Sequence, residues 1–266
     1  MSSQMRILFI GDIVGQPGRM ILQRNISKIK EKYKPDFIIV NGENSAGGRG
    51  MTPKIANFYK ELGVDVVTSG NHIWANKEIF EFMRTSNFVL RPANYPAACP
   101  GVGYTVISKE GNYLAVVNLQ GRVFMRDCLD CPFKAIDSLL TFLNTKTRNI
   151  VIDFHAEATS EKLALAYYLE GKVSAVIGTH THVQTADERV LPGGTAYITD
   201  LGMVGSLNSM IGMKKEPIIN SFLTQMPMRF EVATNPPYIV CGVSVDIDLE
   251  TSKAINIQRI YHVEEE

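Results

Sequence analysis

Short apolar runs alternate along the first third of the chain with longer segments whose apolar residues recur at helical spacing. The strand-like runs are residues 6–10, 37–40 and 64–69. The helix-like segments are residues 17–33, 52–62 and 76–84. Thr52 and Pro53 form a favourable start for the second of these helices, and Gly63 ends it. This alternation of strands and helices predicts a largely parallel, buried sheet.

The rest of the chain contains more strand-like segments. Residues 104–108 and 113–119 are separated only by residues 109–112, which predicts a hairpin. Further strands are expected at 149–154, 173–177, 195–199, 238–248 and 254–262, with helices near 133–144, after Ser160 as the capping residue, and around 216–224. No repeat, low-complexity segment or flexible linker divides the chain. We expect one domain over residues 1–266, with two sheets packed face to face and helices outside.

Composition narrows the class of protein. A hydrophobic content of 45% over 266 residues is typical of a soluble globular protein with a sizeable core. Lys and Arg together equal Asp and Glu, at 27 each, which argues against an extended nucleic-acid track. The N-terminal segment predicts neither a signal peptide nor a membrane span, so no membrane partner is expected.

The four cysteines are expected to be reduced thiols of a cytoplasmic protein. Cys128 and Cys131 form a CxxC motif, but no second pair or nearby histidine completes a zinc site. We therefore favour a surface loop for this motif over a metal or redox role.

Polar side chains gather where five of the predicted strands end. The strand ends have the sequences GD, NGEN, GNH, FHAE and GTHTH, and they contain four of the five histidines. Carboxyl ends of parallel strands share one edge of a sheet, where ligands bind. We expect these residues to meet there: Asp12, Glu43, Asn44, Asn71, His72, His155, His180 and His182.

The donor types in this set indicate the kind of metal. Seven of the residues, all except His72, offer oxygen or imidazole donors and no thiolate, which suits borderline divalent ions such as Mn, Fe, Zn, Ni or Co. Seven ligands are too many for one catalytic zinc and fit two metals about 4 Å apart that share a carboxylate. The HxH pair, His180 and His182, would point to opposite faces in an extended strand, but both can converge in a turn.

Each motif also has an ordinary structural explanation. Asp12 could cap the following helix, the GNH could be a simple turn, and His155 could be a buried histidine with a hydrogen bond. Their joint occurrence at strand ends is what these explanations do not cover. A dinucleotide site at the N-terminus is excluded because Gly11, Gly15 and Gly18 do not have GxGxxG spacing.

Taken together, the motifs resemble those of the calcineurin-like metallophosphoesterases. The closer similarity is to their bacterial YmdB-like branch, through FIGDIVGQPGR, NGENSAGGRG, GNHIW, RPANYP, NLQGR, DFHAEATSEK and GTHTHVQTADERVLPGGTAYITDLGM. The resemblance implies a metallophosphatase-type four-layer sandwich, an α/β fold in which two mixed β-sheets pack face to face. It also implies a metal-dependent phosphodiesterase, with 2′,3′-cyclic nucleotides as preferred substrates, and a tendency to form a homo-oligomer.

The resemblance assigns the ligands to two ions. Val14 replaces the usual histidine of the first motif, and Glu43 replaces the usual bridging aspartate. One ion would be held by Asp12, Glu43, Asn44 and His182, and the other by Glu43, Asn71, His155 and His180. The expected cofactors are two divalent transition-metal ions, Fe or Mn first and Zn as a further candidate.

The two ions would lower the pKa of a bridging water, so that a metal-bridging hydroxide attacks phosphorus. His72 is expected to protonate the leaving oxygen or to bind the phosphate. Arg49, Arg91 and Arg122 are candidates for holding phosphate, and residues 202–215 are expected to form a mobile rim over the site.

Two other classes of function are compatible with the motifs. A metal-containing regulator would keep the centre and act by binding a nucleotide or a protein with little turnover. A metal amidohydrolase also uses HxH, but on the first strand of a barrel, whereas here the pair follows a late strand.

Overall fold

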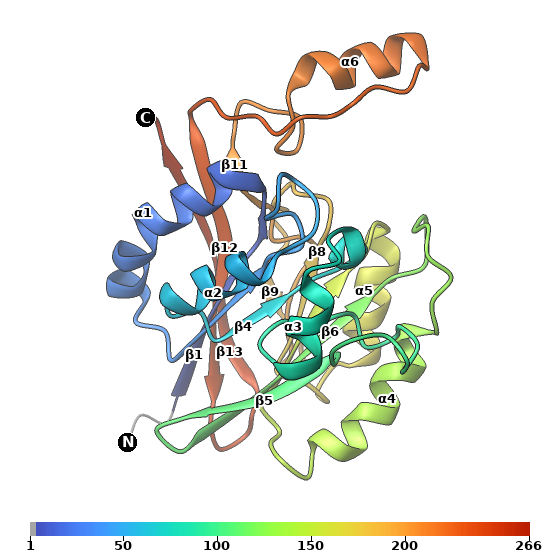
Figure 1. The fold of residues 1–266 in the computed structure, drawn as a ribbon. Coiled ribbons are helices and arrows are strands. Elements are labelled where there is room, and N and C mark those ends of the chain that lie inside the picture. Colours follow the sequence, from blue (N-terminus) through green and yellow to red (C-terminus); the bar gives the residue numbers. More distant parts are fainter. Residues whose placement is uncertain (1–3) are drawn as a thin grey trace.

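Two β-sheets lie face to face in the computed structural model, which describes residues 4–266 (Figure 1). The first sheet has the order β2 (Asp12–Ile13), β11 (Met203–Ser206), β12 (Tyr238–Asp248), β1 (Gln4–Ile10), β3 (Phe37–Asn41) and β4 (Val66–Thr68), and β13 (Ala254–Glu264) pairs with β12. The second has the order β5 (Tyr104–Lys109), β6 (Asn112–Gln120), β7 (Ile150–His155), β8 (Ala175–Thr179), β10 (Ala196–Ile198) and β9 (Arg189–Val190). Both sheets combine parallel and antiparallel pairs.

Helices cover the outer face of each sheet (Figure 1). The helices are α1 (Gly15–Tyr33), α2 (Pro53–Glu61), the 3-10 turn η1 (Ile73–Ala75), α3 (Ile79–Thr85), α4 (Pro132–Leu143), α5 (Thr159–Tyr168) and α6 (Lys215–Thr224). The first three α-helices pack on the first sheet, and α4 and α5 pack on the second.

Three separate apolar layers hold the four layers of secondary structure together. In β1, Phe9 points between the two sheets, whereas Leu8 and Ile10 point toward the helices. In β7, Val151 lies between the sheets and Ile152 packs under the helices of the other side. Side chains that alternate in this way bury both faces of a strand. The expected four-layer sandwich of two mixed sheets is confirmed.

Local sequence signals explain several of the elements. Lys109 pairs with Asn112 across the predicted hairpin, and Glu110 and Gly111 between them have positive φ values of 50° and 83°, as tight hairpin turns require. Thr52 accepts a hydrogen bond from the backbone N–H of Ile55 at the start of α2.

Some predicted boundaries were wrong. Ala158, not Ser160, is the N-cap residue of α5, and its side chain offers no capping hydrogen bond. The helix expected from residue 76 begins at Ile79, because residues 73–75 form the turn η1.

The five strand ends with polar residues belong to two sheets rather than one. β1, β3 and β4 contribute from the first sheet, and β7 and β8 from the second. The carboxyl ends of these strands therefore meet across the sandwich. The amidohydrolase alternative required a closed barrel with HxH on its first strand. The structure has two open sheets instead, which excludes this alternative.

A projecting segment, residues 214–231, which we call the arm, contains α6 and the chain that returns from it (Figure 1). Its root is closed by backbone hydrogen bonds from Lys214 to Glu231 and from Ala233 to Gly212. Of the segment expected to form a rim, Met203–Ser206 lies in the first sheet instead, and only the residues after it approach the site. Among residues 4–266, no helix has the length and apolar character needed to cross a membrane.

Candidate metal centre

All eight residues singled out in the sequence lie at the same end of the sandwich. Asp12 begins β2, Glu43 and Asn44 follow β3, Asn71 and His72 follow β4, His155 ends β7, and His180 and His182 follow β8. Asp12, Glu43, Asn44 and His155 are at most 1% exposed, so half of the cluster is shielded from solvent.

Four of these residues converge on one point. The Nε2 atom of His155 lies 3.0 Å from Asn71 Oδ1 and 3.0 Å from His180 Nδ1. It also lies 3.1 Å from Glu43 Oε1. The donor atoms of Glu43, His155 and His180 are all within 4.8 Å of one another. One carboxylate oxygen, one amide oxygen and two imidazole nitrogens thus surround a space where a single cation fits.

A second group of donors lies beside the first. His182 Nε2 is 3.8 Å from Asp12 Oδ1 and 2.9 Å from Asn44 Nδ2. The Asn44 amide directs its Oδ1 to His72 Nδ1, at 2.7 Å. The amide must therefore turn over for Asn44 to bind a cation through its oxygen.

The ring of His155 is oriented by a chain of hydrogen bonds that crosses the second sheet. His155 Nδ1 donates to Thr179 Oγ1 at 3.0 Å, and Thr179 donates in turn to Asp153 Oδ1 at 2.6 Å. Asp153 also accepts hydrogen bonds from Thr68 and Asn41 of the first sheet. When the ring is neutral, Nδ1 therefore carries the proton, and the lone pair of Nε2 faces the cluster.

His180 and His182, the other two histidines among the predicted ligands, are oriented in the same way. His180 Nε2 lies 3.1 Å from a carboxylate oxygen of Glu157, which leaves Nδ1 facing the cluster. His182 Nδ1 lies 2.8 Å from the carbonyl oxygen of Ile211, which leaves Nε2 facing the cluster. A histidine that binds a metal through one ring nitrogen commonly donates the N–H of its other ring nitrogen to an acceptor of this kind.

The turn after β8 brings both histidines of the HxH motif to one side. His180 and His182 have φ values of 109° and 65°, which are unusual for residues other than glycine and often mark functional sites. The backbone N–H of Thr181 between them donates to Asp200, whose carboxylate also accepts from Lys162, at 2.9 and 2.8 Å. Both members of this Asp200–Lys162 pair are buried, and the pair holds the turn through the backbone N–H of Thr181.

Two buried carboxylate oxygens point into the cluster without a hydrogen bond. In the described chain, Asp12 Oδ1 and Glu43 Oε1 accept none, although their partner oxygens accept from the backbone of His180 and His72. A buried polar atom without a partner is costly, and such atoms in native proteins call for a ligand. The donor set therefore fits divalent cations.

Burial and charge shift the acid–base properties of the cluster. Burial raises the pKa of Asp12 to about 7. Burial alone would lower the pKa of His155, but the Glu43 carboxylate outweighs it and raises the pKa to about 9. Burial and the adjacent His155 lower the pKa of His180 to about 3. Without metal, the site thus favours a proton on His155 opposite an ionised Glu43.

A glycine makes room for the central imidazole. A Cβ atom at Gly70, two residues after the end of β4, would lie 2.1 to 2.4 Å from three ring atoms of His155. Only glycine therefore allows the first sheet to approach the His155 ring of the second sheet so closely.

His72 lies beside the ligand cluster rather than within it. Its Nδ1 is 3.4 Å from Glu43 Oε1, and its backbone N–H donates to Glu43 Oε2. Burial lowers the pKa of its ring against the opposing effect of Glu43. The side chain is 26% exposed and lines the cavity above the cluster.

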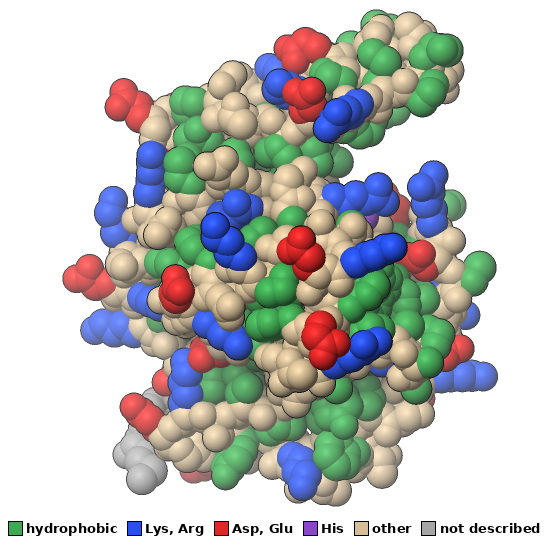
Figure 2. All heavy atoms as spheres, viewed as in Figure 1, with side chains coloured by type: hydrophobic (Ala, Val, Ile, Leu, Met, Phe, Trp, Pro, Cys, Tyr) green, Lys and Arg blue, Asp and Glu red, His purple; other side chains and the backbone are tan. Residues whose placement is uncertain are grey.

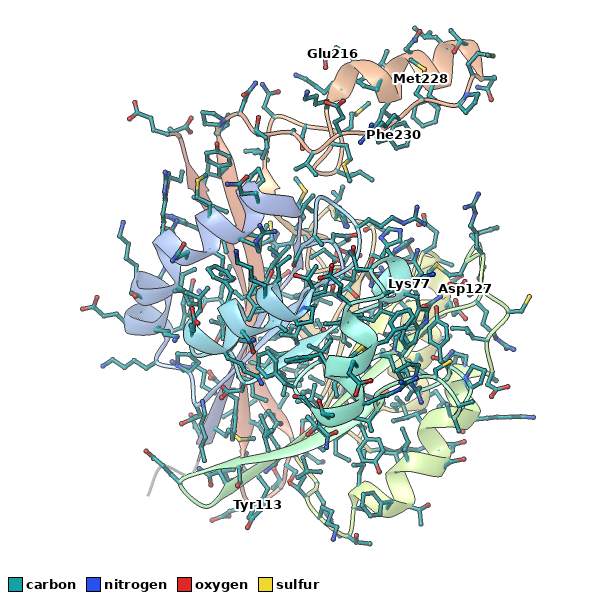
Figure 3. The ribbon with its side chains drawn as sticks, in the orientation of Figure 1. Lys77, Tyr113, Asp127, Glu216, Met228 and Phe230 are labelled. Carbon is teal, nitrogen blue, oxygen red and sulfur yellow. The ribbon has the colours of Figure 1, made fainter. Side chains whose placement is uncertain are left out.

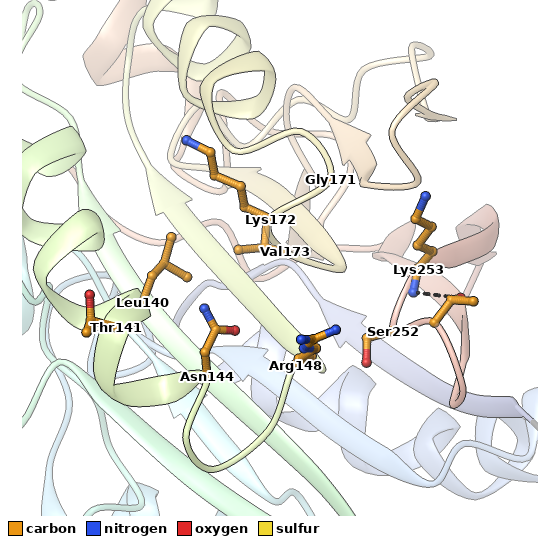
Figure 4. Close-up of a pocket in the computed structure, with 10 residues that line it drawn as sticks. Leu140, Thr141, Asn144, Arg148, Gly171, Lys172, Val173, Ser252 and Lys253 are labelled. Atoms are coloured by element: carbon orange, nitrogen blue, oxygen red, sulfur yellow. Dashed lines mark hydrogen bonds between the residues drawn. The ribbon is translucent and has the colours of Figure 1, made fainter.

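That cavity has a volume of about 620 Å³ and opens between the cluster and the arm, where Figure 2 shows a hollow in the surface. Met210, Ile211 and Met213, from the expected rim, line it together with residues of the arm. A second cavity of about 610 Å³ lies at the amino ends of β7 and β8 and contains none of the predicted site residues (Figure 4).

Sequence reasoning missed the residues that support the ligands. Glu157 was noted only as part of a strand end, and neither Thr179 nor the Asp200–Lys162 pair was recognised. Arg91 does not line the cavity above the cluster, and its buried guanidinium donates instead to the carbonyl oxygens of Pro92 and Tyr95. Cys128 is exposed, as a surface loop predicts, and the four cysteines are free.

Comparisons with known proteins extend over nearly the whole chain. The family model described as YmdB-like protein matches residues 8–260. A Bacillus subtilis (strain 168) protein named 2′,3′-cyclic-nucleotide 2′-phosphodiesterase is 53% identical over 256 residues, 96% of each chain. The crystal structure of a protein from Mycoplasma pneumoniae, described as a novel phosphatase, is similar with a TM-score of 0.93 and 35% identity, covering 100% of this chain and 95% of that one. The crystal structure of a hypothetical protein from Thermus thermophilus has a TM-score of 0.90 at 40% identity, covering 98% of this chain and 100% of that one.

Proposed function

Because this chain belongs to the YmdB-like family, we propose that it is a metal-dependent phosphodiesterase that hydrolyses nucleoside 2′,3′-cyclic phosphates. The observation that supports this most strongly is the convergence of buried carboxylate oxygens on imidazole nitrogens: Glu43 Oε1 lies 3.1 Å from His155 Nε2, and Asp12 Oδ1 lies 3.8 Å from His182 Nε2. The substrate class comes from the name of the Bacillus subtilis relative.

Two divalent cations are the cofactors that we propose. Glu43, Asn71, His155 and His180 would hold one of them. The other would be held by Asp12, Asn44 and His182, with Glu43 shared between the two. Nitrogen and oxygen donors without thiolate favour iron or manganese, with zinc as a further candidate. When bound, the ions would neutralise phosphoryl oxygens and lower the pKa of a water that attacks phosphorus.

His72 is the residue that we propose to complete the reaction. Water gives one proton to solvent as its oxygen bonds to phosphorus, and the bond from phosphorus to the 2′ oxygen breaks. That oxygen takes a proton from the imidazole, which regains one from solvent. In the free protein, burial lowers the pKa of His72, so the ring is neutral at pH 7. The negative phosphate of a bound substrate favours the protonated form and opposes the effect of the cations beside the ring. His72 Nδ1 lies 2.7 Å from the Asn44 amide, which in the turned orientation that metal binding requires would present its NH2 group to the ring, and the side chain lines the cavity.

We place the protein in the cytoplasm, because its four free cysteines suit a reducing compartment.

The test is a hydrolysis assay on protein loaded with manganese or iron, using 2′,3′-cyclic AMP and separating the 2′- and 3′-phosphate products. We expect the 3′-phosphate to form, and Glu43→Ala to abolish both its formation and the metal content. A protein that holds two metals and hydrolyses neither this nucleotide nor bis-p-nitrophenyl phosphate would contradict the proposal and favour the regulatory alternative.

A further inference from the structure

The cavity above the metal centre has two unlike walls. One wall is polar and includes Glu43, His72, His180 and His182. The opposite wall comes from the arm and the turn before it, and its members are uncharged. At about 620 Å³, the cavity has the size of pockets that bind small molecules. A ligand with a charged end and an apolar end matches it.

Two phenylalanine rings of the arm line this apolar wall. Phe222 is 72% exposed and Phe230 is 51% exposed, although large apolar side chains are normally buried. Figure 3 shows Phe230 on the chain that returns beneath α6. Since these rings contribute little to the core, the fold itself does not require them.

The helical register of α6 directs one face to the cavity. Ile218, Ser221 and Phe222, which are three and four residues apart, all line it. The hydroxyl of Ser221 already donates to the carbonyl oxygen of Met226. This face therefore offers an aromatic surface with few hydrogen-bonding groups.

We propose that Phe222 and Phe230 bind the nucleobase of the cyclic nucleotide by stacking, while the phosphate lies at the histidine cluster. This inference rests on the proposed function, and it adds a binding site for the base. Aromatic stacking is tolerant of the base, because every base has a flat π face. The enzyme should therefore accept purine and pyrimidine 2′,3′-cyclic phosphates with similar efficiency.

The experiment compares two substrates that differ only in the base. One is 2′,3′-cyclic AMP, and the other is methyl riboside 2′,3′-cyclic phosphate, in which a methoxy group replaces the base. Wild-type protein should prefer the nucleotide in kcat/KM by about tenfold to a hundredfold, the range typical of base stacking. Phe222→Ala and Phe230→Ala should each reduce this preference, and the double variant should bring it close to one.

Tyr113→Ala is the matched control. Tyr113 is 53% exposed and lies on the β5–β6 hairpin at the far end of the molecule (Figure 3). The control should keep the wild-type preference.

A preference that survives in the double variant would overturn the inference. A loss of the same size for both substrates would also overturn it, because that result indicates a structural role. A drop in molecular mass by light scattering, with the preference unchanged, would assign the two rings to contacts between copies of the chain instead.

Binding separates this inference from the proposed function. Calorimetry with adenosine 3′-phosphate requires no turnover, and Phe222→Ala should weaken its binding at least about fivefold relative to Tyr113→Ala. If the wild type hydrolyses neither substrate but binding still depends on Phe222, the proposed function fails and the base site stands. Equal affinities in the two variants would contradict the base site alone.

Discussion

At the scale of single residues, the site depends on which nitrogen of each histidine carries the proton. One ring nitrogen of each histidine contacts a supporting group, and the other is turned toward the cluster. The supporting groups of His155, His180 and His182 are Thr179, Glu157 and the carbonyl of Ile211, respectively. The remaining nitrogens of His155 and His182 face carboxylate oxygens of Glu43 and Asp12, at 3.1 and 3.8 Å. These contacts fix the ring orientations that binding of a cation requires.

Metal uptake by metal-free protein should strengthen as the pH rises towards 9. The pKa of His155 is raised to about 9, so below that pH a cation must displace a proton from the ring. Burial raises the pKa of Asp12 to about 7, which adds a second proton at lower pH. We expect about one proton to be released at pH 8 and more at pH 6. Calorimetry in buffers of different ionisation enthalpy measures this release, and uptake without release at pH 8 would contradict the assignment of His155.

His72→Ala should keep both metals and lose about 10²- to 10⁴-fold in kcat, the usual contribution of a general acid. A general acid must be protonated, so the wild-type rate should fall as the pH rises through the pKa of His72 in the substrate complex. The variant should lose this decline. Metal analysis and a pH profile on saturated protein test both points, and normal turnover by the variant would refute the role of His72.

At the scale of secondary-structure elements, the close approach of two sheets creates the centre. β4 of the first sheet ends beside β7 of the second, and Gly70 leaves the space that the His155 ring occupies. Asp153 accepts hydrogen bonds from both sheets directly behind this ring.

Gly70→Ala should therefore displace the His155 ring and reduce the metal content from two ions to one or none. Overpacking of this kind typically costs about 1–3 kcal/mol of stability, so the variant should still fold. Gly205→Ala in β11 is the control, because its added Cβ would meet only ordinary contacts, the nearest at 3.5 Å. A Gly70→Ala protein that binds two metals with wild-type affinity would show that the two sheets can separate without loss of the site.

The sequence predicts those parts of the fold and site that depend on neighbours along the chain. The hairpin at Glu110–Gly111 and the start of α2 at Thr52 have local turn and capping signals, and both are observed. Polar residues directly after apolar runs were recognisable as candidate ligands for the same reason.

Features that depend on distant contacts were not predictable. Lys162 occupies a helix, where a lysine normally faces solvent, and only the fold reveals that it is buried against Asp200. Nothing in the sequence near Ile211 indicates that its carbonyl orients His182. The meeting of strand ends from two sheets, rather than one, likewise follows from packing and not from periodicity.

At the scale of the whole molecule, the arm presents two apolar faces. One face of α6 lines the cavity, and the other exposes Ile219 and Leu223, with Met226 following just beyond the helix, at 45%, 79% and 62%. Exposed apolar patches of this kind are typical of protein–protein contacts.

The expected homo-oligomer should form through this outward face. Wild-type protein should have a mass above the 29.5 kDa of one chain in analytical ultracentrifugation, and Leu223→Lys should shift it towards the monomer. Tyr261→Lys, at a side chain of β13 that is 59% exposed, should leave the mass unchanged. A wild-type protein that is monomeric at every concentration would refute this prediction.

The most direct test of the central claim is anomalous scattering from crystals of the metal-loaded protein, recorded at the iron, manganese and zinc absorption edges. Our account predicts two peaks about 4 Å apart, with Glu43 between them. One peak should lie among Asn71, His155 and His180, and the other beside Asp12 and His182. A single peak, or two peaks that Glu43 does not bridge, would contradict it.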